Sequence, residues 1–146
     1  MKNPQALSPV LAFINPPGLY DPRANGYSHV VTATASAPIR LIQIAGQGGE
    51  NAEGQLAKGF PAQVSQALDN LQLALHAAQA TLADVIKLSV LIVDHDEDRL
   101  AVLSRELLRL WGDQPTPACT LIPVPRLALD GMLFEIEALA VMQVGS

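Results

Sequence analysis

Two glutamates near the end of the chain, Glu135 and Glu137, could do acid–base chemistry. Paired carboxylates can exchange protons with a substrate or orient a water molecule. Both belong to one face of an expected strand, about 6.8 Å apart at ~3.4 Å per residue. This spacing also fits two solvated charges on a sheet surface. The neighbours Leu133 and Leu139 on the same face favour Glu135 as the carboxylate in a partly buried setting.

The single cysteine, Cys119, stands at the start of another expected strand. A thiolate nucleophile needs a nearby base or positive charge. The sequence places no histidine beside it, so structural burial is the preferred interpretation. A hairpin turning near residue 128 would put residue 121 opposite residue 135. Cys119 and Glu135 would then share the strand face that the helices leave uncovered.

Metal and phosphate sites are not expected from the sequence. The histidines His29, His76 and His95 are scattered and form no pair with ligand spacing. One cysteine excludes an internal disulfide and a cysteine-rich zinc site. The glycine-rich stretch from Gly46 to Gly49 follows a strand, but no Gly-Lys-Ser/Thr comes after it, so it is predicted to be a turn rather than a phosphate loop.

The elements that must position these side chains follow from apolar periodicity, which predicts one α+β domain over residues 1–146 in the order β-β-α-β-α-β-β. An apolar stripe from Val64 to Ala78 indicates a helix that begins near Pro61. A second helix is predicted over 96–111, and both helices are expected on one face of the sheet. Residues 1–26 are predicted to be an irregular arm. Strands are predicted over 27–37, 41–45, 85–93, 118–124 and 132–142.

Apolar residues occupy both faces of two predicted strands. Residues 132–142 present one face to the helices: Met132, Phe134, Ile136, Ala138, Ala140 and Met142. The opposite face carries Leu133, Leu139 and Val141 beside the glutamates. Residues 85–93 repeat this pattern, with Ile86, Leu88, Val90 and Ile92 on one face and Leu91 and Val93 on the other. Since two helices cannot cover both sides of a sheet, the second face is expected to meet another subunit.

Composition narrows the class of protein. Of 146 residues, 49% are hydrophobic and 16% are charged, against a typical charged share of ~25%, which excludes a disordered chain. The net charge of −5 and a pI of about 5.0 argue against nucleic-acid binding through a basic face. No apolar stretch reaches the ~18 residues of a membrane span, and no export signal is recognised. A cytoplasmic protein without membrane partners is expected.

An ordered set of short segments resembles the Rid family (also called YjgF), the reactive-intermediate imine deaminases. The segments run from about residue 15 to 141: Gly26 to Val31, Ile44 to Gln47, Gln66 to Leu71, Asp84 to Leu88, Pro117-Ala118 and Phe134 to Ala138. The resemblance implies a chorismate-mutase-like α+β fold with two helices on one face of a mixed sheet. It also implies a homotrimer with small-molecule sites in the clefts between subunits.

The family's best-known activity is hydrolysis of 2-imino or enamino acids to 2-oxo acids and ammonia, without metal or cofactor. By resemblance, Tyr27 matches a tyrosine that lines the pocket and Glu135 matches a glutamate that orients water. The family's arginine, which grips the substrate carboxylate as a bidentate fork, does not match, because Pro117-Ala118 is followed by Cys119. The chain therefore resembles an arginine-lacking branch. The one arginine nearby in sequence, Arg126, is expected to point elsewhere.

Two classes of function follow. The first is a cofactor-independent hydrolase or deaminase of a small imine, enamine or related labile nitrogen metabolite. Glu135 would hold the attacking water, Tyr27 would shape the pocket, and backbone N–H groups near Cys119 and Gly46 would stabilise negative charge. The second is a non-catalytic trimer that binds a small metabolite or a partner protein in the same clefts. Ribonuclease activity, reported for some relatives, fits poorly with the acidic pI and the lack of a basic cluster.

Overall fold

The computed structural model describes residues 9–144. Its elements are β1 (Val10–Ile14), β2 (Val30–Thr34), β3 (Ile39–Gly48), α1 (Phe60–Ala77), β4 (Val85–Val93), α2 (Glu97–Trp111), β5 (Ala118–Val124) and β6 (Phe134–Gln143), with short 3₁₀ helices at Arg23–Asn25 and Leu82–Asp84. Residues 1–8 of the predicted N-terminal arm lie outside the described residues. Over the remainder, the predicted helices and the five predicted strands are all present: β4 and β5 have the predicted ends, and the ends of the others are shifted.

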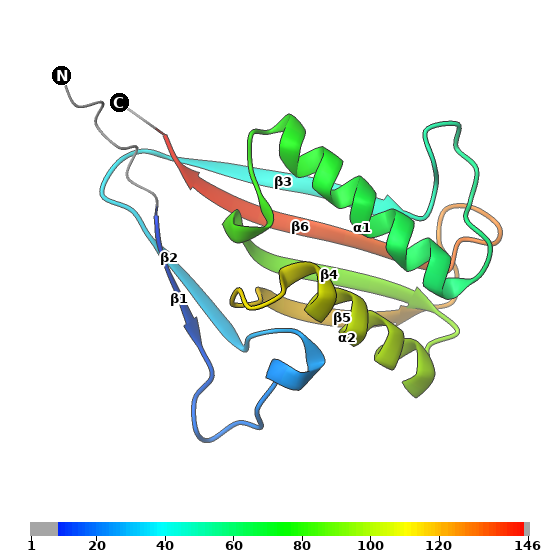
Figure 1. Cartoon of the computed structure of the whole chain (residues 1–146), viewed down its shortest axis with the longest axis horizontal. Coiled ribbons are helices and arrows are strands. Elements are labelled where there is room, and N and C mark those ends of the chain that lie inside the picture. Colours follow the sequence, from blue (N-terminus) through cyan, green and yellow to red (C-terminus); the bar gives the residue numbers. More distant parts are fainter. Residues whose placement is uncertain (1–8, 145–146) are drawn as a thin grey trace.

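Strands β3 to β6 form one mixed sheet in the order β3-β6-β4-β5. Strand β6 pairs antiparallel with β3 and with β4, and β4 pairs parallel with β5. Both helices lie on the same face of this sheet (Figure 1). The predicted α+β architecture, with two helices on one face of a mixed sheet, is therefore confirmed.

The predicted hairpin between β5 and β6 is wrong, because β4 lies between these two strands. A short connection does not make two strands neighbours. Strand β6 contains fully buried Phe134, Ile136 and Ala140, so it takes an interior position. Strand β5 contains Pro123, which has no N–H to donate to a second neighbour and suits an edge strand.

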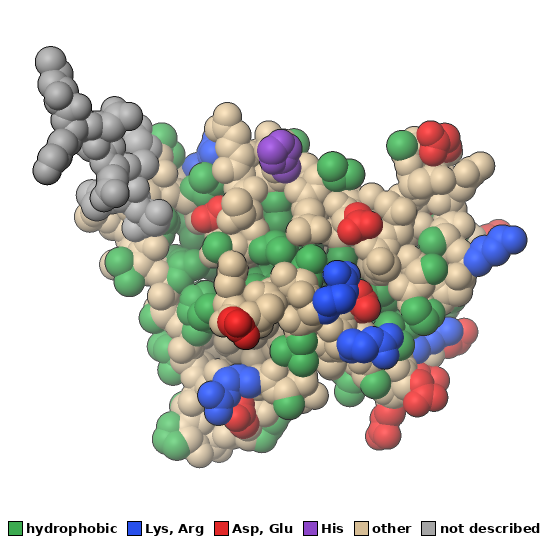
Figure 2. Space-filling view, in the orientation of Figure 1, with side chains coloured by type: hydrophobic (Ala, Val, Ile, Leu, Met, Phe, Trp, Pro, Cys, Tyr) green, Lys and Arg blue, Asp and Glu red, His purple; other side chains and the backbone are tan. Residues whose placement is uncertain are grey.

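The N-terminal arm is not wholly irregular as predicted. Strands β1 and β2 pair antiparallel, with Ile14 opposite Val30 and Val10 opposite Thr34, and form a separate two-stranded ribbon. Neither strand contains a charged residue. The ribbon diverges from the four-stranded sheet (Figure 1), and hydrophobic side chains are visible along it in Figure 2.

The core lies between the helices and the sheet. Helix α1 buries Val64, Leu68, Leu71 and Leu75, as its spacing predicts. The helix-facing side of β6 is buried as expected, and Phe134 packs edge-to-face on Phe60 with ring centroids 5.9 Å apart. One assignment differs: a register shift between Val85 and Lys87 buries Val85 and leaves Ile86 half-buried, because the extra residue changes the alternation.

Helix α2 is fixed at both ends by local chemistry. The side chain of Asp96 accepts a hydrogen bond from the backbone N–H of Arg99 at 2.8 Å, which caps the helix start. Gly112 ends the helix in a positive-φ conformation. Between these ends, Leu103 and Leu107 are buried. Their positions matter for the site described next, because they form one wall of a cavity.

Candidate functional site

Glu135 lies at the start of β6 on the sheet face that the helices do not cover. It is in register with Leu91 of β4 and Gly48 of β3. Its carboxylate lies directly on Gly46, since a methyl group at position 46 would be only 1.6 Å from the Oε1 atom of Glu135. Within residues 9–144, the Glu135 side chain has no hydrogen-bond or ion-pair partner. The half-buried carboxylate is therefore available to a water molecule or a ligand.

Helix α1 holds the backbone that carries Gly46. The register between β3 and β6 shifts between Ile44 and Gln47, so the chain bulges at Gly46. Just beyond the bulge, the Asn70 side-chain amide donates to the carbonyl oxygens of Gly48 at 2.9 Å and Glu50 at 2.8 Å. These two bonds tie the end of β3 to a helix that packs on the sheet through buried leucines, so the surface on which the Glu135 carboxylate rests is fixed.

Tyr27 and Cys119 line a second feature, a cavity of about 210 Å³ between α2, β5 and the N-terminal arm. Cys119 is in register with buried Leu88 of β4, so it faces the helices. The predicted common face for Cys119 and Glu135 is therefore wrong. The predicted alignment depended on the β5–β6 hairpin. The complete lining of the cavity is Tyr20, Asn25, Tyr27, Leu100, Leu103, Leu107, Cys119 and Leu121.

Local contacts place Tyr27 at this cavity. Gly26 adopts a left-handed conformation with φ +79°, and a Cβ there would lie 3.2 Å from the Cβ of Leu107 on α2. Ser28 then donates two hydrogen bonds to the segment before β5, from its hydroxyl to the Thr116 carbonyl at 2.6 Å and from its N–H to the Pro117 carbonyl at 3.0 Å. The turn and the two bonds hold the chain on both sides of Tyr27 against α2 and the start of β5.

Three rings gather at the rim of the cavity. The rings of Tyr20, Tyr27 and His29 pack edge-to-face, with centroid separations of 5.0 to 6.5 Å. The hydroxyls of Tyr20 and Tyr27 are hydrogen-bonded to each other, and a ring nitrogen of His29 lies 2.8 Å from the Tyr20 carbonyl. The rim of the cavity is therefore aromatic and carries polar groups, whereas the leucines deeper in the cavity form an apolar wall.

Burial raises the pKa of the Cys119 thiol to about 11, an effect that the positive charge of Lys87 only partly opposes. The thiol is therefore neutral near pH 7, as expected for a structural cysteine and unlike an activated nucleophile. The ammonium of Lys87 is on the other face of the sheet, where it donates to the Thr120 hydroxyl at 2.6 Å.

We expect iodoacetamide to alkylate Cys119 roughly 10²-fold more slowly than glutathione at pH 8, because a thiol with a raised pKa carries far less thiolate. The rate should rise with pH until about 11, the pKa of the thiol. Mass spectrometry of the alkylated protein over a pH series measures the alkylation rate at pH 8 and the increase of that rate with pH. A rate equal to that of glutathione at pH 8 would contradict the burial of Cys119.

The predicted site residues thus form two pairs on opposite faces of one sheet. Gly46 and Glu135 form one pair, and Tyr27 and Cys119 form the other. Sequence reasoning missed Asn25 and Tyr20, which line the cavity from the arm. They stand in a stretch rich in turn residues, where no periodicity signals a wall of a cavity. Arg126 points away as expected, and its guanidinium pairs with the Asp130 carboxylate at 3.0 Å.

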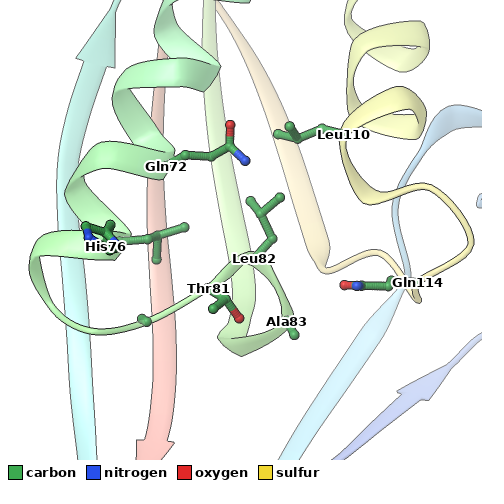
Figure 3. A pocket seen from close by; sticks show the side chains of 9 residues that line it. Gln72, His76, Thr81, Leu82, Ala83, Leu110 and Gln114 are labelled. Atoms are coloured by element: carbon green, nitrogen blue, oxygen red, sulfur yellow. The ribbon is translucent and has the colours of Figure 1, made fainter.

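A larger cavity of about 420 Å³ lies between the C-terminal halves of both helices. Gln72 and Leu110 extend toward it from α1 and α2, and Gln114 and Thr81 lie at its far side (Figure 3). It contains none of the predicted site residues.

Among residues 9–144 no group of three or more His, Cys, Asp or Glu side chains could hold a metal ion, and no helix there is long and apolar enough to cross a membrane.

The family model described as Endoribonuclease L-PSP, the YjgF/Rid family, matches residues 21–142. The chain belongs to the YjgF/Rid family. A solved structure of a Rid-family protein of unknown function, YyfB from Yersinia pestis, is 36% identical with a TM-score of 0.82, over 89% of this chain and 97% of that one. No curated protein matches the chain.

Two other solved structures are less similar but share the fold. RidA from an Antarctic Psychrobacter species is 31% identical, with a TM-score of 0.60 over 71% of this chain and 80% of that one. A putative endoribonuclease from Thermotoga maritima is 27% identical, with a TM-score of 0.63 over 72% and 80%. The likeness confirms the predicted family, and the residue at position 119 of this member is cysteine.

Proposed function

We propose that this Rid-family protein is a cofactor-independent hydrolase of a small imine or enamine. The single observation that supports it is the Glu135 carboxylate, which packs on Gly46 and has no partner among residues 9–144. A carboxylate placed in this way can accept a proton from water at the moment of attack.

Glu135 can carry both proton transfers of the hydrolysis. The water oxygen bonds to the imine carbon while Glu135 accepts a water proton, and the C=N π electrons pass to nitrogen, which takes that proton from Glu135 to give a neutral carbinolamine. The resulting carbinolamine loses ammonia as its C–N bond breaks and a C=O bond forms. In this second step Glu135 accepts the hydroxyl proton and donates it to the leaving nitrogen. One imine and one water yield one carbonyl compound and one ammonia. In a cleft between two copies, backbone N–H groups near Gly46 of one chain and near Cys119 of the other would stabilise the developing negative charge.

A second copy of the chain is part of the proposal, because the Gly46–Glu135 pair and the Tyr27–Cys119 pair lie on opposite faces of one sheet. A cleft between copies could bring Glu135 of one chain to the cavity of the next. The uncovered sheet face supports such a contact, since Leu41 is 58% and Ile122 is 45% exposed. The β1–β2 ribbon supports it too, because an isolated two-stranded ribbon is at best marginally stable in water.

Native mass spectrometry or light scattering is expected to give about three chains per particle, the assembly that the family resemblance implies. Burial of the uncovered sheet face provides the driving force. A monomer at micromolar concentration would contradict a site shared between chains.

The activity is tested by ammonia release from freshly generated 2-iminobutyrate and aminoacrylate, together with a panel of imines that lack a carboxylate. Release above the spontaneous rate supports the proposal. No release with any imine would favour the second candidate, a non-catalytic small-molecule-binding protein. The observation behind that candidate is Cys119, which provides no positive charge where a carboxylate would bind. An RNA substrate is disfavoured by the net charge of −5.

A further inference from the structure

The cavity between α2, β5 and the N-terminal arm has no charged side chain in its lining. Leu103 and Leu107 form its buried wall, and Leu100, Leu121 and Cys119 are partly exposed beside them. The polar groups come from the arm: the hydroxyls of Tyr20 and Tyr27 and the amide of Asn25. A ligand in this cavity would therefore contact leucine side chains on one side and neutral hydrogen-bonding groups on the other.

No positively charged Lys or Arg side chain lines this cavity, although three lie near it. Lys87 donates to Thr120 on the opposite face of the sheet. Arg105 lines a neighbouring groove beyond Asn25, and its guanidinium lies 3.9 Å from the Glu106 carboxylate. Arg23 in the arm forms an ion pair with Asp21 at 2.6 Å. A carboxylate placed among the leucines would thus lose its hydration without gaining a cation, which is unfavourable.

The size of the cavity sets the size of the ligand. A dry protein cavity of ~150 Å³ binds benzene, so a cavity of about 210 Å³ accommodates one ring or a branched aliphatic group with a small substituent. Among residues 9–144 the Asn25 side-chain amide makes no hydrogen bond, so it can bind the substituent at the rim. Together these features describe a compact apolar ligand with one uncharged polar group.

We infer that this cavity binds an uncharged, ring-sized ligand and discriminates against carboxylates. In terms of the proposed function, on which this part rests, the substrates are imines of neutral aldehydes or ketones rather than 2-imino acids. The leucine wall takes the apolar body, and the Asn25 amide and the Tyr27 hydroxyl bind the polar end. Cys119 contributes a small neutral surface that leaves the cavity open.

Benzamide and benzoate test this directly, because they have nearly the same shape and differ in charge. An NMR titration of the wild-type protein, followed through the methyl signals of Leu103 and Leu121, gives both dissociation constants. Benzamide is expected to bind at least about tenfold more tightly than benzoate. Equal or tighter binding of benzoate, or no binding of benzamide up to its solubility limit, would overturn the inference.

Three variants test where benzamide binds and whether the missing positive charge explains weak benzoate binding. Leu121→Phe fills the cavity from an edge strand that tolerates aromatic residues, and it should abolish benzamide binding. Leu73→Phe makes the same change at a position that is 68% exposed on α1, and it should leave binding unchanged. Cys119→Arg supplies the missing cation, and it should strengthen benzoate binding at least about tenfold. Benzamide binding that survives Leu121→Phe would place the site elsewhere and overturn the inference.

The result of the benzamide and benzoate titrations is separable from the test of the proposed function. Neither compound is an imine that the proposed reaction would hydrolyse, and neither titration needs Glu135. If benzamide binds as expected but no imine releases ammonia, only the hydrolase proposal fails. If 2-imino acids are hydrolysed while benzamide does not bind, only the inference about the ligand class fails.

Discussion

Glu135→Gln is expected to lower imine hydrolysis by about 10²-fold or more, the lower range for a positioned acid–base group. The amide is nearly isosteric with the carboxylate but cannot accept a proton from water. Since the Glu135 side chain has no partner within residues 9–144, the substitution breaks no ion pair or hydrogen bond there. Fold and oligomeric state should therefore be unchanged. Ammonia release under saturating substrate gives kcat, and circular dichroism and light scattering check the fold and the assembly.

Glu137→Gln is the matched control. Glu137 lies two residues further along β6 on the same face of the sheet, in register with Ser89 of β4, and the family resemblance assigns it no role. Its substitution should change kcat much less. Equal losses from the two variants, or full activity of Glu135→Gln on an identified substrate, would show that Glu135 is a surface or interface carboxylate.

Gly46→Ala should reduce the same activity by roughly 10²-fold without removing any catalytic group. The new methyl group would lie 1.6 Å from the Oε1 atom of Glu135, so the carboxylate must move away. A misplacement of about 1 Å can cost 10²-fold in rate. The clash involves the end of a flexible side chain, so the free energy of unfolding should change little. Steady-state kinetics and urea denaturation measure the two effects separately.

The matched control is Gly18→Ala, the same change in the arm at a position with no atom within 4 Å of the added methyl group. It should retain full kcat. The double variant Gly46→Ala/Glu135→Gln should be no slower than Glu135→Gln alone, because residues that act through one group are not additive. A double variant with the product of both losses would mean that Gly46 contributes independently of Glu135.

The sequence by itself determined the two helices, the strands β2 to β6 and the face of β6 on which Glu135 lies, but not β1. Helical spacing in α1 and the alternation of Phe134, Ile136 and Ala138 are local patterns, and each has one orientation that buries most apolar area. The predicted second apolar face also follows from alternation. Local pattern therefore located the Glu135 half of the candidate site, and the family resemblance gave it a chemical role.

Only the tertiary structure decided the neighbours of β5 and the face on which Cys119 lies. One face of β5 carries Cys119 and Leu121, and the other carries Thr120 and Ile122. Each face mixes an aliphatic with a less apolar residue, so hydrophobicity does not choose between them. Pairing with β4 decides it, because Cys119 aligns with buried Leu88.

The same holds for the approach of Glu135 to Gly46 and for the cavity wall formed by Asn25. A one-residue bulge between Ile44 and Gln47 brings Gly46 to the Glu135 carboxylate. The packing of the arm against α2 brings Asn25 to the cavity. Both depend on contacts between segments that are distant in sequence. Their free energy comes from the assembled core rather than from any local preference, so no periodicity in the chain encodes them.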